Sequence, residues 1–150
     1  MIPEATYRAK IDNCRRIVTP VRLLNVANGR EEVVNGLWDT GSEISVVSRG
    51  LSARLDLPYN RSLSVNGFGG RSEVRAVMAL TFPGDFEYAV VVQAIETDGI
   101  CDGVEFIIGM DIIDKGEFSL VRDGKSLVLT FKFGELFTHL KSEWITRFDA

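Results

Sequence analysis

The sequence is poor in the residues that most often carry metal, redox or nucleophilic chemistry. It has a single histidine, His139, and two cysteines, Cys14 and Cys101, among its 150 residues. A lone histidine without an HExxH pattern and two cysteines without a CxxC pair argue against the usual zinc sites and histidine-activated nucleophiles. A glycine-rich phosphate loop is also missing. We therefore expect neither a metal nor a cofactor.

Long apolar runs and an excess of positive charge are missing as well. No stretch approaches the roughly 20 apolar residues of a membrane-spanning helix, and the first residues lack the apolar region of a secretory signal. The 17 Lys and Arg against 21 Asp and Glu give a net charge of −4, which argues against binding to nucleic acids or anionic membranes. We expect a cytoplasmic protein with reduced cysteines, whose partners are neither nucleic acids nor membranes.

What is present is the composition of one globular domain rich in strands. Hydrophobic residues make up 45% of the chain, enough to bury a core without disulfides. Short apolar or β-branched runs alternate with glycine-containing breaks, a pattern typical of an all-β barrel or sandwich. The nine predicted strands span residues 17–26, 32–38, 44–47, 63–65, 73–82, 87–94, 104–108, 117–121 and 126–133.

Three further segments have helical patterns, and they span residues 48–57, 110–115 and 134–150. The last of them repeats apolar residues at steps of four from Leu136 to Phe148, which predicts an amphipathic C-terminal helix. The expected organisation is an N-terminal extension (1–16), a β domain (17–133) and a C-terminal amphipathic helix (134–150).

Several carboxylates lie close together in the second half of the chain. They are Asp98, Asp102, Glu105, Asp111 and Asp114. Their spacing lacks the Asp-x-Asp-x-Asp-Gly alternation that directs several oxygens at one calcium ion. A solvated acidic loop is therefore the preferred interpretation, and a cation site the weaker one.

The best candidate for chemistry is the LWDTGS segment at residues 37–42, which places one carboxylate on a tight turn between two apolar strands. Apolar walls disfavour an ionised Asp39 unless hydrogen-bond donors surround it. The hydroxyls of Thr40 and Ser42 and the backbone N–H groups around Gly41 are candidate donors. Taken alone, such a tripeptide is more often an ordinary β-turn.

Three segments in this order together resemble the retropepsin-like aspartic proteases, the family of the retroviral proteases and their single-domain relatives. The first is the turn at residues 37–42. The second, VNGFGG at residues 65–70, is similar to the glycine-rich flap hairpin of those enzymes, and the third, FIIG at residues 106–109, resembles their apolar-apolar-Gly segment. The resemblance covers residues 17–133. It implies a small closed barrel with a short helix after Gly109, and it brings Gly109 close behind the catalytic turn.

The resemblance also implies a function, that of an aspartic endopeptidase acting on extended peptides or proteins. It makes Asp39 the catalytic carboxylate, with Thr40 and Gly41 in support. Because the chain has one such turn, the active species would be a homodimer in which two Asp39 carboxylates share a proton and activate a water. This chemistry requires no metal or cofactor. The residues implied to contact the substrate are Ser42, Asn66, Gly67, Phe68, Gly69 and Gly70.

The chain departs from the retroviral pattern at three positions near the turn. Trp38 is larger than the usual aliphatic residue, which implies a different pocket behind the turn. Met110 stands where retroviral enzymes have an arginine, so that Glu43 would lack this partner. Ser42 replaces a common alanine, and its hydroxyl is expected to stabilise an ionised Asp39.

Two alternatives stay open. The same fold can serve as a noncatalytic dimerisation or peptide-binding module, and the departures at Trp38 and Met110 are compatible with that use. The C-terminal helix can pack on its own subunit, which is the preferred interpretation, or add to the contact between subunits.

Overall fold

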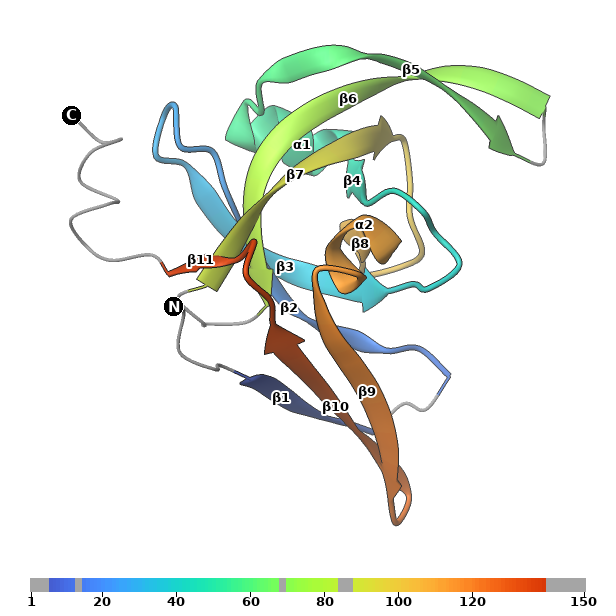
Figure 1. Cartoon of the computed structure of the whole chain (residues 1–150). Helices are drawn as coiled ribbons and strands as arrows, with labels where there is room; N and C mark the ends of the chain where they lie inside the picture. The colour runs from blue at the N-terminus through green and yellow to red at the C-terminus, as the bar shows by residue number, and fades with distance from the viewer. Residues whose placement is uncertain (1–5, 13–14, 68–69, 84–87, 140–150) are drawn as a thin grey trace.

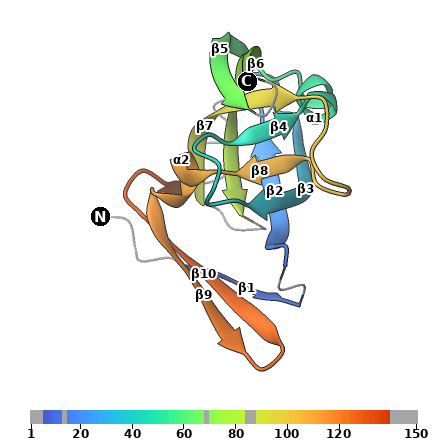
Figure 2. The same cartoon turned by 90° about the vertical axis from the view of Figure 1, so that its right-hand side faces the viewer.

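Strands dominate the chain, as its pattern predicts. The computed structural model in Figures 1 and 2 describes residues 6–12, 15–67, 70–83 and 88–139, without the side chains of 60–76, 78–83 and 139. Its strands are β1 (Thr6–Ile11), β2 (Val18–Leu24), β3 (Glu31–Trp38), β4 (Val46–Ser48), β5 (Tyr59–Gly67), β6 (Gly70–Pro83), β7 (Tyr88–Thr97), β8 (Phe106–Ile108), β9 (Gly116–Asp123), β10 (Ser126–Phe133) and β11 (Thr138–His139). Its helices are α1 (Arg49–Leu55) and α2 (Met110–Ile113).

A ring of strand pairings forms the expected small closed barrel. Neighbouring strands follow the order β7–β4–β8–β3–β2–β6, and β6 pairs in turn with β7. Two of these pairings are parallel, β3 with β8 and β4 with β7. The long strand β6 continues beyond the ring and pairs with β5, so that the β5–β6 hairpin projects from the barrel (Figure 1).

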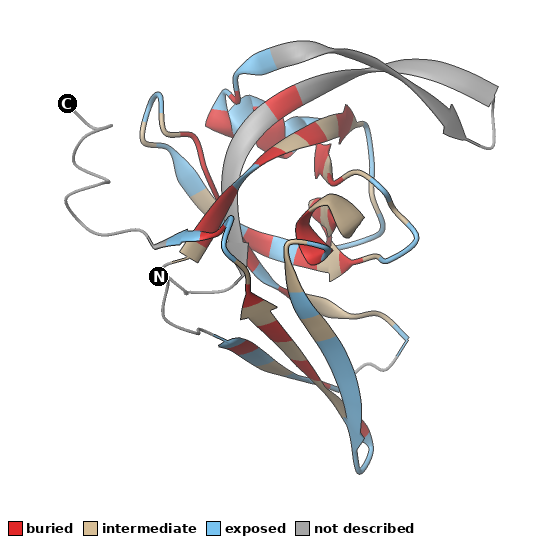
Figure 3. Ribbon diagram, in the orientation of Figure 1, coloured by how far each residue is buried: buried red, intermediate tan, exposed pale blue. Residues whose placement is uncertain are grey.

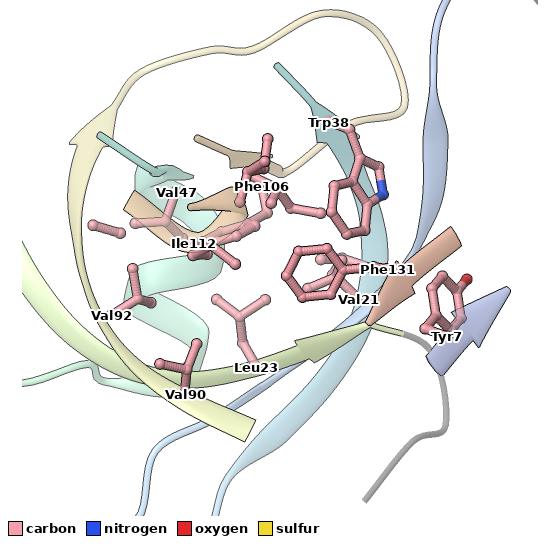
Figure 4. Close-up of a cluster of buried hydrophobic side chains, with 14 of the residues drawn as sticks. Tyr7, Val21, Leu23, Trp38, Val47, Val90, Val92, Phe106, Ile112 and Phe131 are labelled. Atoms are coloured by element: carbon pink, nitrogen blue, oxygen red, sulfur yellow. The ribbon is translucent and has the colours of Figure 1, made fainter. Parts of the chain in front are cut away.

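The barrel encloses an apolar core because alternate residues of each strand point inward. Buried positions alternate with partly buried ones along most of β7 and β10, as the colouring of Figure 3 shows. Figure 4 shows the inward side chains converging, among them Val21, Leu23, Val47, Val92 and Phe106. The helix α1 adds Leu51 and Leu55 to this core.

A second, three-stranded sheet in the order β1–β10–β9 packs against the core through aromatic residues. Trp38, at the end of β3, contacts the rings of Phe118 and Phe131, with centroids 5.5 and 5.4 Å away. Its indole Nε1 donates a hydrogen bond to the buried Thr19 hydroxyl at 2.8 Å. Trp38, the large residue before Asp39, thus connects the barrel with the second sheet.

All nine predicted strands and both predicted internal helices are present, most of them with shifted ends. The helix predicted at 48–57 is α1, which begins after Ser48, whose hydroxyl accepts a hydrogen bond from the N–H of Leu51. The short helix expected after Gly109 is α2. The largest shift concerns the strand predicted at 63–65, which extends over Tyr59–Gly67 because it pairs along β6.

Both ends of the described chain differ from expectation. The extension predicted at 1–16 contains β1, which pairs with β10 and buries Tyr7 and Ile11. After Gly134, the chain makes a turn and the short strand β11 in place of the start of the predicted helix. Phe137 is buried there while Leu136 is exposed, so core packing and pairing with β7 override the helical period. The rest of the predicted helix, 140–150, lies outside the described residues.

We expect energetic coupling between Trp38 and Thr19. Thr19→Val leaves the buried indole N–H without its acceptor and should lower the free energy of unfolding by about 1–3 kcal/mol. Trp38→Phe should cost more, because it removes ring contacts and also leaves the Thr19 hydroxyl without its donor. The double variant should lose less than the sum of the two, measured by urea unfolding. Additive losses would contradict this coupling.

Candidate active site

Asp39 lies directly after β3, where the main chain is held from both sides. The N–H of Trp38 donates to the carbonyl of Ile17 at 2.9 Å, and the N–H of Asp39 donates to the carbonyl of Ile108 at 3.0 Å. The carboxylate Oδ1 accepts a hydrogen bond from the N–H of Gly41 at 2.9 Å. Asp39 is half-buried while Thr40 and Gly41 are exposed. The expected backbone donor is therefore present, and the turn is accessible.

Ser42 does not act as expected on Asp39. Its hydroxyl donates to the carbonyl of Ile44 at 2.6 Å, two residues along the same loop. Serine hydroxyls often make such local bonds to the main chain, in competition with more distant acceptors. The expectation that this hydroxyl stabilises the Asp39 carboxylate is wrong, whereas a substrate contact at Ser42 stays a prediction.

Gly109 passes close behind the turn, as the resemblance implies. A Cβ atom at this position would lie 2.8 Å from the carbonyl carbon of Ile44 and 2.9 Å from the carbonyl oxygen of Ser42. The next residue, Met110, donates its N–H to the same Ser42 oxygen at 2.7 Å. Only a glycine permits this approach without displacing the loop.

Asp111 braces the loop that follows the turn, a role the sequence interpretation missed. Its two carboxylate oxygens accept hydrogen bonds from the N–H and the hydroxyl of Ser45, at 3.0 and 2.7 Å. The Ser45 hydroxyl oxygen in turn accepts from the N–H of Gly109 at 3.1 Å. Ser45 and Asp111 are 66 residues apart, so no local pattern pairs them. The only available signal was an acid two residues after Gly109.

The acidic segment is therefore not simply a solvated loop. Asp111 is engaged with Ser45, and Glu105 receives two hydrogen bonds of 2.8 Å from Arg54. Glu32 also accepts hydrogen bonds from Nε of Arg54, and the carboxylates of Glu32 and Glu105 raise the pKa of Arg54 above its usual range through these bonds. Asp98, Asp102 and Asp114 are exposed, as expected. Within the described ranges, no group of His, Cys, Asp and Glu is arranged to hold a metal ion.

The strand register places a row of apolar side chains on one face of the sheet, beside Asp39. Leu37 of β3 pairs with Ile107 of β8. Ile107 also pairs with Val46 of β4 on its other side. Val46 pairs in turn with Ile95 of β7. Directly paired residues point to the same face, so these four side chains form a continuous row. All four are half-buried, on the face opposite the core. Such a row can bind apolar side chains of an extended peptide.

The predicted glycine-rich hairpin is present as β5 and β6, whose pairing runs to Gly67 and Gly70. Asn66 pairs with Arg71 one step before the end. Phe68 and Gly69 lie outside the described residues. The hairpin joins the site through β6, where Ala76 pairs with Ile95 at the end of the apolar row. The substrate contacts assigned to the hairpin stay predictions.

Two solved structures share this architecture. A retropepsin-like aspartic protease from Rickettsia conorii superposes with a TM-score of 0.53 at 12% identity, over 89% of this chain and 98% of that chain. The EIAV protease bound to an inhibitor gives a TM-score of 0.50 at 22% identity, over 68% of this chain and 88% of that chain. The chain has the retropepsin fold. No protein-family model and no curated protein matches the sequence.

The retropepsin fold is braced in this chain without the retroviral arginine. Met110 packs partly buried against the core, and Glu43 is exposed. The loop is tied instead by Asp111, whose carboxylate binds Ser45 and whose N–H donates to the carbonyl of Glu43 at 3.2 Å. In the described part of the chain, no helix has the length and apolarity needed to cross a bilayer.

Loss of the Asp111 carboxylate should destabilise the protein. Asp111→Ala leaves the Ser45 N–H and hydroxyl without their acceptor, and we expect a loss of about 2–4 kcal/mol in the free energy of unfolding. Asp111→Asn should lose less, because an amide can still bind both Ser45 groups. The exposed Asp114, replaced by alanine, is the control. Equal free energies of unfolding of the two alanine variants in urea would contradict a stabilising role of the Asp111 carboxylate.

Proposed function

We propose that the chain is an aspartic endopeptidase that acts as a homodimer. The observation that carries the proposal is the half-buried Asp39 carboxylate on an exposed turn, held by the Gly41 N–H and fixed to β8 through its own N–H. The apolar row from Leu37 to Ile95 lies beside it on the same sheet. A reactive carboxylate next to an open apolar surface suits the hydrolysis of an extended peptide.

The second carboxylate has to come from another copy of the chain. The other Asp-Gly pairs in the described residues are placed differently: Asp98 and Asp102 are exposed in the loop between β7 and β8, and Asp123 lies at the end of β9. A two-fold axis beside Asp39 would bring the same side chain of both copies together. The exposed Thr40 and Gly41 are then available to support the paired turns and the substrate backbone.

The chemistry follows from one proton shared between two carboxylates. The ionised Asp39 removes a proton from a water held between the pair, and the resulting hydroxide attacks the scissile carbonyl carbon. The protonated Asp39 of the other copy donates its proton to the carbonyl oxygen. The tetrahedral intermediate collapses as the C–N bond breaks and the leaving nitrogen takes up a proton from the pair. The products are a carboxylic acid and an amine.

A noncatalytic dimerisation or peptide-binding module is the second candidate. The observation in its favour is that the retroviral arginine is replaced by Met110 and that Glu43 is exposed. Such a module would use the same apolar row and hairpin without chemistry at Asp39. The two candidates differ in whether peptide cleavage depends on the Asp39 carboxylate.

Asp39→Asn should abolish cleavage of a peptide library at pH 4–7. The amide cannot act as a general base, so we expect the rate to fall by a factor on the order of 10² to 10⁴. The matched control is Asp98→Asn, which removes an exposed carboxylate from another Asp-Gly pair. Cleavage products can be counted by mass spectrometry. Undiminished cleavage by Asp39→Asn, or no cleavage by the unmodified chain, would exclude the proposed function.

The requirement for two copies can be tested by mixing. When the unmodified chain is re-equilibrated with an equal amount of Asp39→Asn, half of its copies should enter mixed dimers. The cleavage rate, divided by the amount of unmodified chain, should then fall to about half, because a mixed dimer carries only one Asp39 carboxylate. Mixing with the Asp98→Asn variant should have no such effect. An enzyme acting as a monomer would keep its full activity in both mixtures.

A further inference from the structure

Two large aliphatic residues are exposed on the outer side of the barrel, near β11. Val90 and Val92 of β7 are buried in the core, so Val91 between them points outward, and it is 57% exposed. Leu136, in the turn that precedes β11, is 67% exposed. Leu136 lies two residues before Thr138 and Val91 two residues after Ala89, so the antiparallel pairing of Thr138 with Ala89 brings both to the same level of the sheet.

The strand register continues this apolar surface from β7 across β6 to β2. Val91 pairs with Leu80 of β6, and Leu80 pairs on its other side with Leu24 of β2. Leu23 points into the core, so Leu24 lies on the outer face. We call Leu24, Leu80, Val91 and Leu136 the outer patch. Single exposed apolar residues are common, whereas a contiguous group of them marks an interaction site.

The outer patch is separate from the candidate active site. Val91 lies four residues before Ile95, which ends the apolar row that begins beside Asp39, and four residues of strand span roughly 13 Å. A ligand on the apolar row therefore does not cover the outer patch, and another occupant is needed.

The chain leaves β11 next to the outer patch. β11 ends at His139, which pairs with Tyr88, three residues before Val91 or roughly 10 Å at the usual rise of a strand. The remaining residues, 140–150, would span about 16 Å as a helix. Neighbouring strands lie about 5 Å apart, so this length suffices to cross β7, β6 and β2 at the level of Val91.

These last residues also have the pattern that such a surface requires. Their large apolar residues recur at the spacing of one helical face, and they are Leu140, Trp144, Ile145 and Phe148. The polar residues of the opposite face are Ser142, Glu143 and Thr146. A helix this short is hardly stable in water by itself, because it depends on packing its apolar face against the rest of the protein.

We propose that residues 140–150 form an amphipathic helix that covers the outer patch of the same copy of the chain. The proposal is independent of the proposed function, because it involves neither Asp39 nor the apolar row. Leu120 and Val121 of β9 are exposed as well, but they belong to the second sheet, whereas β11 pairs with β7 and so directs the segment to the barrel.

The first test follows the fluorescence of Trp144, one of two tryptophans in the chain. The difference between the emission spectra of the unmodified chain and Trp144→Phe isolates this indole. Its emission should lie at shorter wavelength than that of free tryptophan, with weak quenching by iodide. Val91→Lys should shift the emission to longer wavelength and strengthen the quenching. Val121→Lys, at a valine that is 61% exposed on β9, is the matched control and should change neither.

Mixing two variants decides whether the segment covers its own copy or a second one. Val91→Lys retains Trp144 but has a damaged patch, whereas Trp144→Phe retains an intact patch. When the two are re-equilibrated together, Trp144 should stay at the long wavelength, because it faces the lysine of its own copy. A return to the short wavelength would place the segment on a second copy and overturn the proposal.

A double-mutant cycle in the full chain measures the contact itself. Val91→Lys and Trp144→Gln should each lower the midpoint of urea unfolding, measured by circular dichroism at one protein concentration. Together they should lower it by less than the sum, because either change alone already releases the helix. The shifts of Val121→Lys and Trp144→Gln should be additive.

Three results would overturn the proposal. Trp144 that is as exposed as free tryptophan would leave the outer patch to another protein. Equal effects of Val91→Lys and Val121→Lys on its emission would place the segment elsewhere on the chain. Additive shifts of Val91→Lys and Trp144→Gln would show that the two residues do not share an interface.

Discussion

The arrangement of the site depends on one close crossing of the main chain, where Gly109 passes behind the loop that carries Asp39. The absent side chain lets the backbone approach Ile44 and Ser42. Hydrogen bonds from Asp39 to Ile108 and from Met110 to Ser42 then tie the two segments together on both sides of the crossing. A larger residue at this point would separate the turn from β8 and from the apolar row that continues across it.

Two supports hold this crossing from opposite sides. Asp111 binds Ser45 and so fixes the loop after the turn, without the arginine of retroviral enzymes. Trp38 fixes the residue before the turn, because its indole bonds to Thr19 and its ring packs against the aromatic face of the second sheet. The Asp39 carboxylate itself is left with a bond to the Gly41 N–H and an exposed turn around it. Rigid support on both sides of an accessible carboxylate is what a hydrolytic site requires.

The face of the sheet beside Asp39 is apolar. Paired strands align half-buried aliphatic side chains from Leu37 to Ile95, a surface suited to apolar residues of a peptide. Apolar contacts contribute binding energy with little selectivity between similar side chains. For the proposed protease, this row favours substrates with apolar residues at the cleaved bond.

The local features of this protein could be predicted from its sequence, because they depend on neighbouring residues. Alternating apolar residues and glycine-containing breaks predicted nine strands. The close passage of Gly109 behind the Asp39 turn joins distant segments, and it was implied by the family resemblance and not by neighbouring residues. Only the tertiary structure decided which distant groups bond to one another. In that structure, the Ser42 hydroxyl bonds to the carbonyl of Ile44, and Asp111 bonds to Ser45. Residues 6–11 and 138–139 form strands there. Those outcomes depend on partners brought together by strand pairing across the whole barrel, and no periodicity or short motif encodes such a partner.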